Sequence, residues 1–197
     1  MDKNMKFEDE VKKLIQKHKM VNMANSKNSV ENRLGFSQAT FKDYENSKFK
    51  RAFLNPYRHH FNEIGGEATF TLTNVVPMTT TLHQLWSSRD DFMVVTAEKC
   101  DKMYVVTGVV PGNTGIENGR VTVPSHVWSA YCCVDVRGNP TLSGATIKEN
   151  KDYDITKDKA ERVEIIELER KLKELFKVSD AITIFPGTCS IAGPSRP

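Results

Sequence analysis

The sequence has few cysteines, no long apolar run and little excess of either charge. Its 197 residues include 28 Lys and Arg against 25 Asp and Glu, a net charge of +3 that by itself marks no binder of nucleic acid or membranes. No apolar run approaches the roughly 20 residues of a membrane-spanning helix, and no signal-like segment opens the sequence. We therefore expect no membrane partner and, for the sequence as written, a cytoplasmic location.

The four cysteines are Cys100, Cys132, Cys133 and Cys189. None forms a Cys-x-x-Cys pair, which argues against a zinc site. Four cysteines allow three disulfide pairings, and the sequence neither chooses between them nor indicates whether the thiols are oxidised. Because successive residues of a strand point to opposite faces of a sheet, we expect at most one of Cys132 and Cys133 to enter the core.

The composition is that of a folded domain, because 39% of the residues are hydrophobic and 27% are charged. The first 33 residues differ from the rest, with helical apolar spacing at 7–20 and a linker rich in Asn, Ser and Lys at 22–32. The main domain is predicted at 34–190, and a flexible tail at 191–197. We find no internal repeat.

Alternating and helical apolar patterns predict the elements of this domain. Strands are expected at 68–74, 103–110, 120–123, 126–136, 141–147 and 181–185, and helices at 79–92 and 159–177. Strands in a block with helices inserted and appended favour an α+β fold over alternating βαβ units.

Several motifs follow one another in order between Gln38 and Cys189. They are Gln38-Ala39, Asp43-Tyr44, Leu54-Asn55-Pro56, ATFTLTNVVP at 68–77 with Trp86 after it, VVTGVVPGNT at 105–114, VPSHVWSAYCC at 123–133 and FPGTC at 185–189. In this order they resemble the DNA/RNA non-specific endonuclease family, most closely its endonuclease domain-containing branch. The resemblance covers about three quarters of the chain.

The resemblance implies a ββα-metal nuclease fold, with DNA or RNA as the partner. Such enzymes hold one magnesium ion largely through water, and a His in an Asp-Arg-Gly-His motif acts as general base toward a water molecule. The chemistry requires both parts. A base poised near neutral pH must activate the water, and a cation must take up charge on the scissile phosphate.

The general base is where this sequence departs from the family. Lys50-Arg51-Ala52-Phe53 stands in place of Asp-Arg-Gly-His, so Phe53 occupies the position of the missing base. The resemblance assigns a phosphate contact to Arg51, whereas the alternative is a structural ion pair with an acidic residue such as Asp43, Glu63 or Asp90. His59 and His60 either belong to a solvated loop or supply a relocated base or phosphate contact.

The metal position departs as well. The resemblance places Asn74 in the catalytic region and the metal-ligand Asn nine residues later, where this chain has His83. Asp90 stands where related nucleases carry an acidic residue that supports the metal-bound water. Magnesium prefers oxygen ligands, so we expect magnesium binding to be weak or lost.

A short basic stretch near the motif is the candidate nucleic-acid contact. Its members are Lys48, Lys50, Arg51 and Arg58, with Phe49 among them. Basic residues next to an aromatic ring can hold a nucleic-acid backbone, although such runs are also common on solvated strand edges. Trp86 is predicted to be a core residue.

Family members usually begin with a signal peptide and N-terminal strands, which this sequence does not show. A truncated secreted protein is the alternative to a cytoplasmic one, and missing strands would leave a sheet edge exposed.

The leading hypothesis is a degenerate, catalytically impaired endonuclease-like domain that retains nucleic-acid or metal binding. One alternative is an active magnesium-dependent non-specific endonuclease. The other is a structural or partner-binding protein that uses the predicted helix at 159–177.

Overall fold

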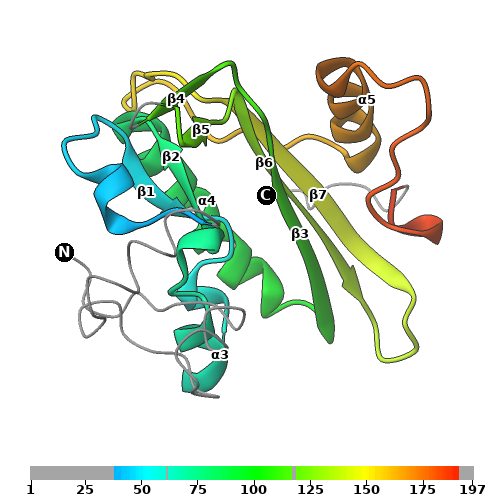
Figure 1. Ribbon diagram of the computed structural model, residues 1–197. Helices are drawn as coiled ribbons and strands as arrows, with labels where there is room; N and C mark the ends of the chain where they lie inside the picture. The colour runs from blue at the N-terminus through cyan, green and yellow to red at the C-terminus, as the bar shows by residue number, and fades with distance from the viewer. Residues whose placement is uncertain (1–37, 61, 117–118, 191–197) are drawn as a thin grey trace. The chain divides into compact units, whose positions relative to one another are not determined.

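The computed structural model describes residues 38–60, 62–116 and 119–190 (Figure 1). They fall into two compact units, one comprising the chain up to Met78 together with Thr114–Val123 and the other Thr79–Asn113 and the chain from Pro124. The helix predicted at 7–20, the linker at 22–32 and the tail at 191–197 lie outside the described residues. No helix in the described part is long and apolar enough to span a bilayer.

The first unit contains two short antiparallel strand pairs. Strand β1 (Lys50–Phe53) pairs with β2 (Val75–Met78), and β4 (Thr114–Ile116) pairs with β5 (Val121–Val123). Helix α3 (Glu63–Ala68) lies between β1 and β2 in the sequence. Among the described residues, the unit also has 3₁₀ turns at Phe41–Tyr44, Tyr57–His59 and Leu72–Asn74. Its core is made of apolar side chains from these turns and strands, namely Tyr44, Leu72, Val75, Ile116 and Val123, with Phe41, Phe49 and Phe53 packed against them.

The prediction of a strand at 68–74 is wrong. This segment contains the last residue of α3 and then the turn Leu72–Asn74, before β2 begins. The Thr69 hydroxyl donates to the Gly66 carbonyl at 2.7 Å, and the Asn74 amide donates to the Thr69 carbonyl at 2.9 Å. Such local side-chain bonds offer the backbone an alternative to a strand ladder, so the alternating Thr pattern was misleading.

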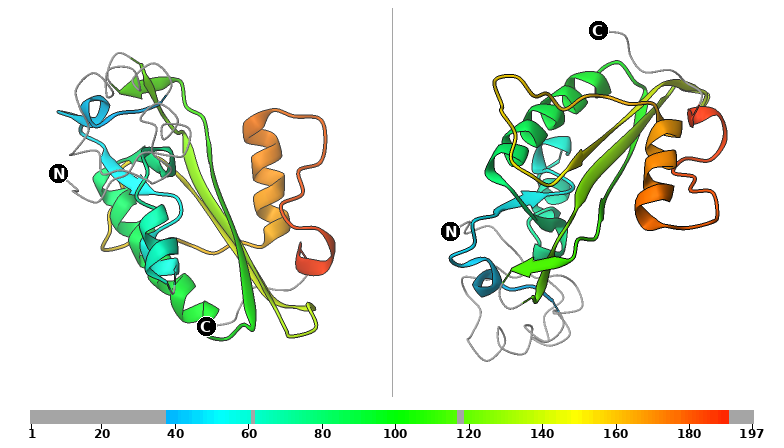
Figure 2. Two further views of the ribbon diagram at one scale, coloured as in Figure 1. Left: turned by 60° about the horizontal axis from the view of Figure 1, so that its bottom comes forward. Right: turned by 90° about the horizontal axis from the view of Figure 1, so that it is seen from above.

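The second unit is a three-stranded antiparallel sheet covered on both faces. The strands β3 (Lys102–Val110), β6 (His126–Val134) and β7 (Pro140–Glu149) lie in the order β3-β6-β7. Helix α4 (Thr80–Ala97) lies on one face and α5 (Ile165–Phe176) on the other, as Figure 2 shows. The sequence predicted these three strands and α4. The fold of the chain is accordingly α+β, as predicted.

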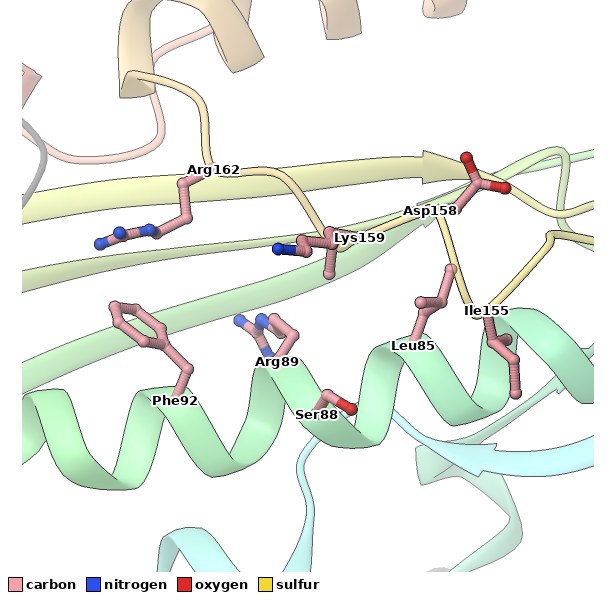
Figure 3. A pocket seen from close by; sticks show the side chains of 9 residues that line it. Leu85, Ser88, Arg89, Phe92, Ile155, Asp158, Lys159 and Arg162 are labelled. Carbon is pink, nitrogen blue, oxygen red and sulfur yellow. The ribbon is translucent and has the colours of Figure 1, made fainter. Parts of the chain in front are cut away.

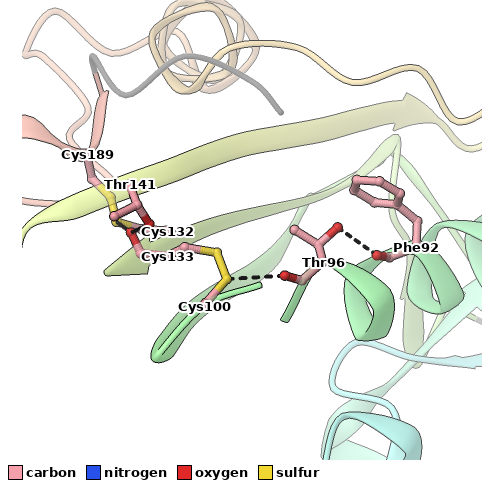
Figure 4. Close-up of a disulfide and its surroundings, with 7 residues drawn as sticks. All are labelled: Phe92, Thr96, Cys100, Cys132, Cys133, Thr141 and Cys189. Carbon is pink, nitrogen blue, oxygen red and sulfur yellow. Dashed lines mark hydrogen bonds between the residues drawn. A yellow bond between two sulfur atoms is a disulfide. The ribbon is translucent and has the colours of Figure 1, made fainter. Parts of the chain in front are cut away.

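The prediction that at most one of Cys132 and Cys133 enters the core is wrong, because both are buried. Cys133 packs with Met93 of α4, whereas Cys132 packs with the residues of α5 on the opposite face. Each forms a disulfide (Figure 4). Cys133 is bonded to Cys100 with 5.3 Å between their Cα atoms, and Cys132 to Cys189 with 6.0 Å. A sheet with two covered faces buries both members of a neighbouring pair.

Two further predictions near the C-terminus are corrected. The helix predicted at 159–177 begins only at Ile165, because Val163 forms an antiparallel bridge with Ala145 on the outer edge of β7. The strand predicted at 181–185 is absent from the described residues, and the backbone N–H of Ile184 instead donates to the Glu169 carboxylate at 2.9 Å. With Val163 already bridged to β7, the later segment has no strand partner there, so it packs as a loop.

Candidate active site

Strand β1 carries two of the predicted site residues on one face. Arg51 and Phe53 are separated by the buried Ala52, and alternation along a strand places them on the same side. The Phe53 ring meets Phe70 edge to face with 5.6 Å between ring centroids, and Phe70 stacks on Tyr57 at 5.5 Å. Phe53, which the sequence predicts at the position of the general base, is therefore part of an aromatic row and offers no proton acceptor.

Asn74 holds the end of β1 against the turn that precedes β2. Its Oδ1 atom accepts from the backbone N–H of Asn55 at 2.9 Å, and its amide nitrogen donates to the Asn55 carbonyl at 2.8 Å and to the Thr69 carbonyl at 2.9 Å. The backbone N–H of Leu54 also donates to the Asn74 carbonyl at 3.0 Å. The Asn74 side chain thus has a well-defined structural role in the first unit.

The structure adds a histidine to this asparagine pair. The Nε2 atom of His60 lies 3.0 Å from the Oδ1 atom of Asn55, while His59 ends the preceding 3₁₀ turn. Both imidazoles are half-buried. Sequence reasoning named His60 but missed Asn55 as its partner. The signal was present in the Leu54-Asn55-Pro56 motif, although the hydrogen bonds across 19 residues were not visible in the sequence.

Arg51 is not the partner of Asp43. Its guanidinium carbon lies 5.0 Å from the centre of the Phe41 ring, whereas the Asp43 carboxylate accepts from Arg120 Nε at 2.6 Å. Asp43 also accepts from the backbone N–H of Thr40 at 2.6 Å. Burial raises the pKa of Asp43, but the hydrogen bonds from Arg120 and Thr40 outweigh burial, so its pKa lies below the usual value of 3.8.

The remaining basic residues of the predicted contact are exposed. The Lys48 ammonium lies 5.4 Å from the centre of the Phe49 ring, and Lys50 begins β1 on the face opposite to Arg51. Arg58 lies in the 3₁₀ turn after β1. Tyr44 belongs to the core of this unit, and burial raises the pKa of its hydroxyl to about 12. We use the name basic surface for these four cations together (Lys48, Lys50, Arg51 and Arg58), which lie on or near β1 and include both of its faces; all belong to the first unit.

His83 and Asp90 lie on α4, which belongs to the second unit. His83 is half-buried in the first turns of the helix, and its carbonyl accepts from the Ser87 hydroxyl at 3.1 Å. Asp90 is buried, and its carboxylate pairs with the Arg89 guanidinium at 2.8 Å. The predicted positions are thus divided between the units, and Arg51, Phe53 and Asn74 are brought together within the first.

These side chains do not make a good set of magnesium ligands. The described residues contain no group of three or more His, Cys, Asp or Glu that could hold a metal ion. The Asn74 amide is engaged by backbone groups, the Asp90 carboxylate by Arg89, and His83 offers nitrogen where magnesium prefers oxygen. The predicted residues therefore do not fit a magnesium ion.

Comparison with known proteins identifies the family. Residues 29–189 match the family model of the DNA/RNA non-specific endonucleases. Two curated relatives, each named Endonuclease domain-containing 1 protein, are 35% identical over 144 residues (Mus musculus) and 34% identical over 143 residues (Homo sapiens). The matches cover 71% and 70% of this chain, but this chain spans only 28% and 27% of the relatives' lengths.

A crystal structure of the EndoG/EndoGI complex, which was described to explain how EndoG is inhibited, shares the fold. The two structures match with a TM-score of 0.58 and 17% sequence identity, and the match covers 67% of this chain and 60% of the matched chain in the complex. The resemblance and the ββα-metal nuclease fold expected from the motifs are confirmed. The chain belongs to the DNA/RNA non-specific endonuclease family.

Proposed function

We propose that this domain is a catalytically impaired endonuclease that still binds DNA or RNA through its basic surface. The observation that carries the proposal is Phe53, whose ring packs edge to face on Phe70 at the position of the general base. A phenyl ring accepts no proton, and loss of a general base typically lowers the rate by about 10²- to 10⁴-fold. The unfavourable set of magnesium ligands points in the same direction.

Nucleic-acid binding is supported by what the first unit keeps. Arg51 presents a guanidinium on the same face of β1 as Phe53, and the fork of a guanidinium matches two phosphate oxygens. Lys48, Lys50 and Arg58 add exposed positive charge nearby in the sequence. Binding through such cations releases counterions, so it should weaken steeply as the salt concentration rises.

The test is a plasmid-nicking assay with magnesium or manganese, run on the native chain and on Phe53→His. We expect cleavage by the native chain near background, and a rise of at least tenfold for Phe53→His where the rest of the machinery is intact. Phe49→His is the matched control, because Phe49 is also a half-buried ring packed against the same core. Efficient cleavage by the native chain that a chelator abolishes would overturn the impaired-enzyme proposal.

The hydrogen bond of His60 favours a second candidate function, an active magnesium-dependent endonuclease with a relocated base. His60 Nε2 lies 3.0 Å from Asn55 Oδ1, and Asn55 is bound in turn to Asn74. Here Arg51 would hold the phosphate and His60 would take the proton. Loss of chelator-sensitive nicking in His60→Ala but not in His59→Ala would establish this candidate. If the native protein neither nicks DNA nor binds nucleic acid at low salt, both nuclease-derived functions are excluded and the structural or partner-binding hypothesis remains.

A further inference from the structure

The second unit contains a pocket that the nuclease family's predicted site residues do not line. It has a volume of about 360 Å³ and lies between α4 and the segment that joins β7 to α5 (Figure 3). Its wall from α4 includes Leu85, Arg89 and Phe92, and its wall from the joining segment includes Ile155, Lys159 and Arg162. The volume of the pocket is within the usual range of small-molecule sites, about 300–1,000 Å³.

The pocket and the predicted metal position use opposite sides of α4. The wall uses four helical residues whose mutual offsets of one, three, four and seven place them on one stripe of α4, namely Leu85, Ser88, Arg89 and Phe92. At about 100° per residue, the centre of this stripe lies roughly 180° around the helix from His83. A ligand in this pocket would therefore not occupy the metal position.

The pocket contains a cation that is fixed in place. Arg89 is buried, donates to Asp90 at 2.8 Å and to the Ser129 hydroxyl, and lies 5.0 Å from the centre of the Trp86 ring. These two hydrogen bonds use two of the five N–H donors of a guanidinium. Arg89 also lines the pocket, so its guanidinium is already ordered for binding a ligand there.

Two further cations approach the pocket from the joining segment. Figure 3 shows the Lys159 ammonium and the Arg162 guanidinium reaching over α4, and the Arg162 guanidinium carbon lies 4.4 Å from the centre of the Phe92 ring. The Asp158 carboxylate points away from the helix and accepts from the backbone N–H of Asp154 at 2.9 Å. Lys159 and Arg162 thus add positive charge beside the Arg89–Asp90 pair, and this charge would attract an anion to the pocket.

Apolar side chains make up the rest of the wall. Leu85 and Ile155 provide surfaces for a planar or apolar group beside the cations, while Arg162 lies over the Phe92 ring. An inorganic anion would leave this surface uncovered, whereas an organic phosphate matches both parts. A phosphate monoester carries a charge of about −1.5 to −2 at pH 7, which suits a set of cations better than a carboxylate does.

We propose that this pocket binds the phosphate monoester of a single nucleotide, with the phosphate on Arg89, Lys159 and Arg162 and the base against Leu85 and Ile155. The choice of a nucleotide among organic phosphates rests on the proposed function. The phosphate comes either from a free nucleoside monophosphate or from the phosphorylated end of a strand. In both cases the pocket is a second nucleotide site, separate from the basic surface.

The test is titration calorimetry of the full chain at low salt with 5′-AMP, adenosine and inorganic phosphate. We expect 5′-AMP to bind more tightly than phosphate, adenosine not to bind, and affinity to fall as salt rises. Lys159→Met should weaken 5′-AMP binding about tenfold, because it removes one charge-assisted contact. Lys157→Met is the matched control, since Lys157 is exposed in the same segment, pairs with Asp154 at 3.3 Å and does not line the pocket.

Three outcomes would overturn the proposal. They are no binding of 5′-AMP at millimolar concentration, equal losses in Lys157→Met and Lys159→Met, and adenosine binding as tightly as 5′-AMP. Arg51→Met separates this proposal from the proposed function. It should weaken DNA binding and leave 5′-AMP binding unchanged, whereas loss of 5′-AMP binding would place the nucleotide on the basic surface. A 5′-phosphorylated dinucleotide, compared with its unphosphorylated form, distinguishes a strand end from a free nucleotide.

Discussion

Replacing Cys132 and Cys189 together by alanine removes the disulfide that ties the C-terminal segment to the central strand β6. The bond closes a loop of 57 residues, and in the chain-entropy model its loss should lower the free energy of unfolding by about 4 kcal/mol. The disulfide of Cys100 and Cys133 closes a loop of 33 residues, so its loss should cost about 0.5 kcal/mol less. The two loops overlap only at β6, so the effects should be nearly additive.

The assay is urea unfolding of the parent, the two paired variants and the variant lacking all four cysteines. The combined loss is about 8 kcal/mol, which is comparable with the whole stability of a typical domain, about 5–15 kcal/mol, so the last variant should be largely unfolded without denaturant. Reduction of the unchanged protein separates the effect of the closed loop from the loss of the buried sulfur atoms. Equal urea midpoints for the parent and the Cys132/Cys189 variant would refute the reasoning.

Two further predictions concern the first unit. Asn74→Ala removes the three hydrogen bonds that the Asn74 side chain makes to Asn55 and Thr69. The free energy of unfolding should therefore fall by about 1–3 kcal/mol in chemical denaturation. An unchanged value would contradict the structural role of Asn74. Asp43 has a lowered pKa, so its stabilising effect is complete above the ordinary value of 3.8 and is lost as the pH falls through the folded-state pKa. Unfolding measured between pH 5 and pH 2 should therefore lose part of its pH dependence in Asp43→Asn, and an unchanged profile would contradict the ion pair with Arg120.

The elements that the sequence predicted correctly are those with local signals. Strands β3, β6 and β7 are bounded by turn residues such as Gly138 and Asn139, and α4 is a long segment without Gly or Pro that is capped by Thr79. The errors occur where other contacts override the apolar pattern, a tertiary one in the first case and local side-chain hydrogen bonds in the second. Val163 is held in a bridge to β7 and is not helical, and the Thr-rich segment before Asn74 is turned by its own side chains.

The sequence by itself determined the family, because ordered motifs need no coordinates, and it predicted Phe53 at the position of the general base. Only the tertiary structure decided which cysteines pair, that His60 meets Asn55, and that Arg89 and Lys159 line one pocket. Each of these depends on segments far apart in the chain. Such contacts are chosen by the packing of the whole unit, since strand pairing and side-chain burial compete over all partners at once.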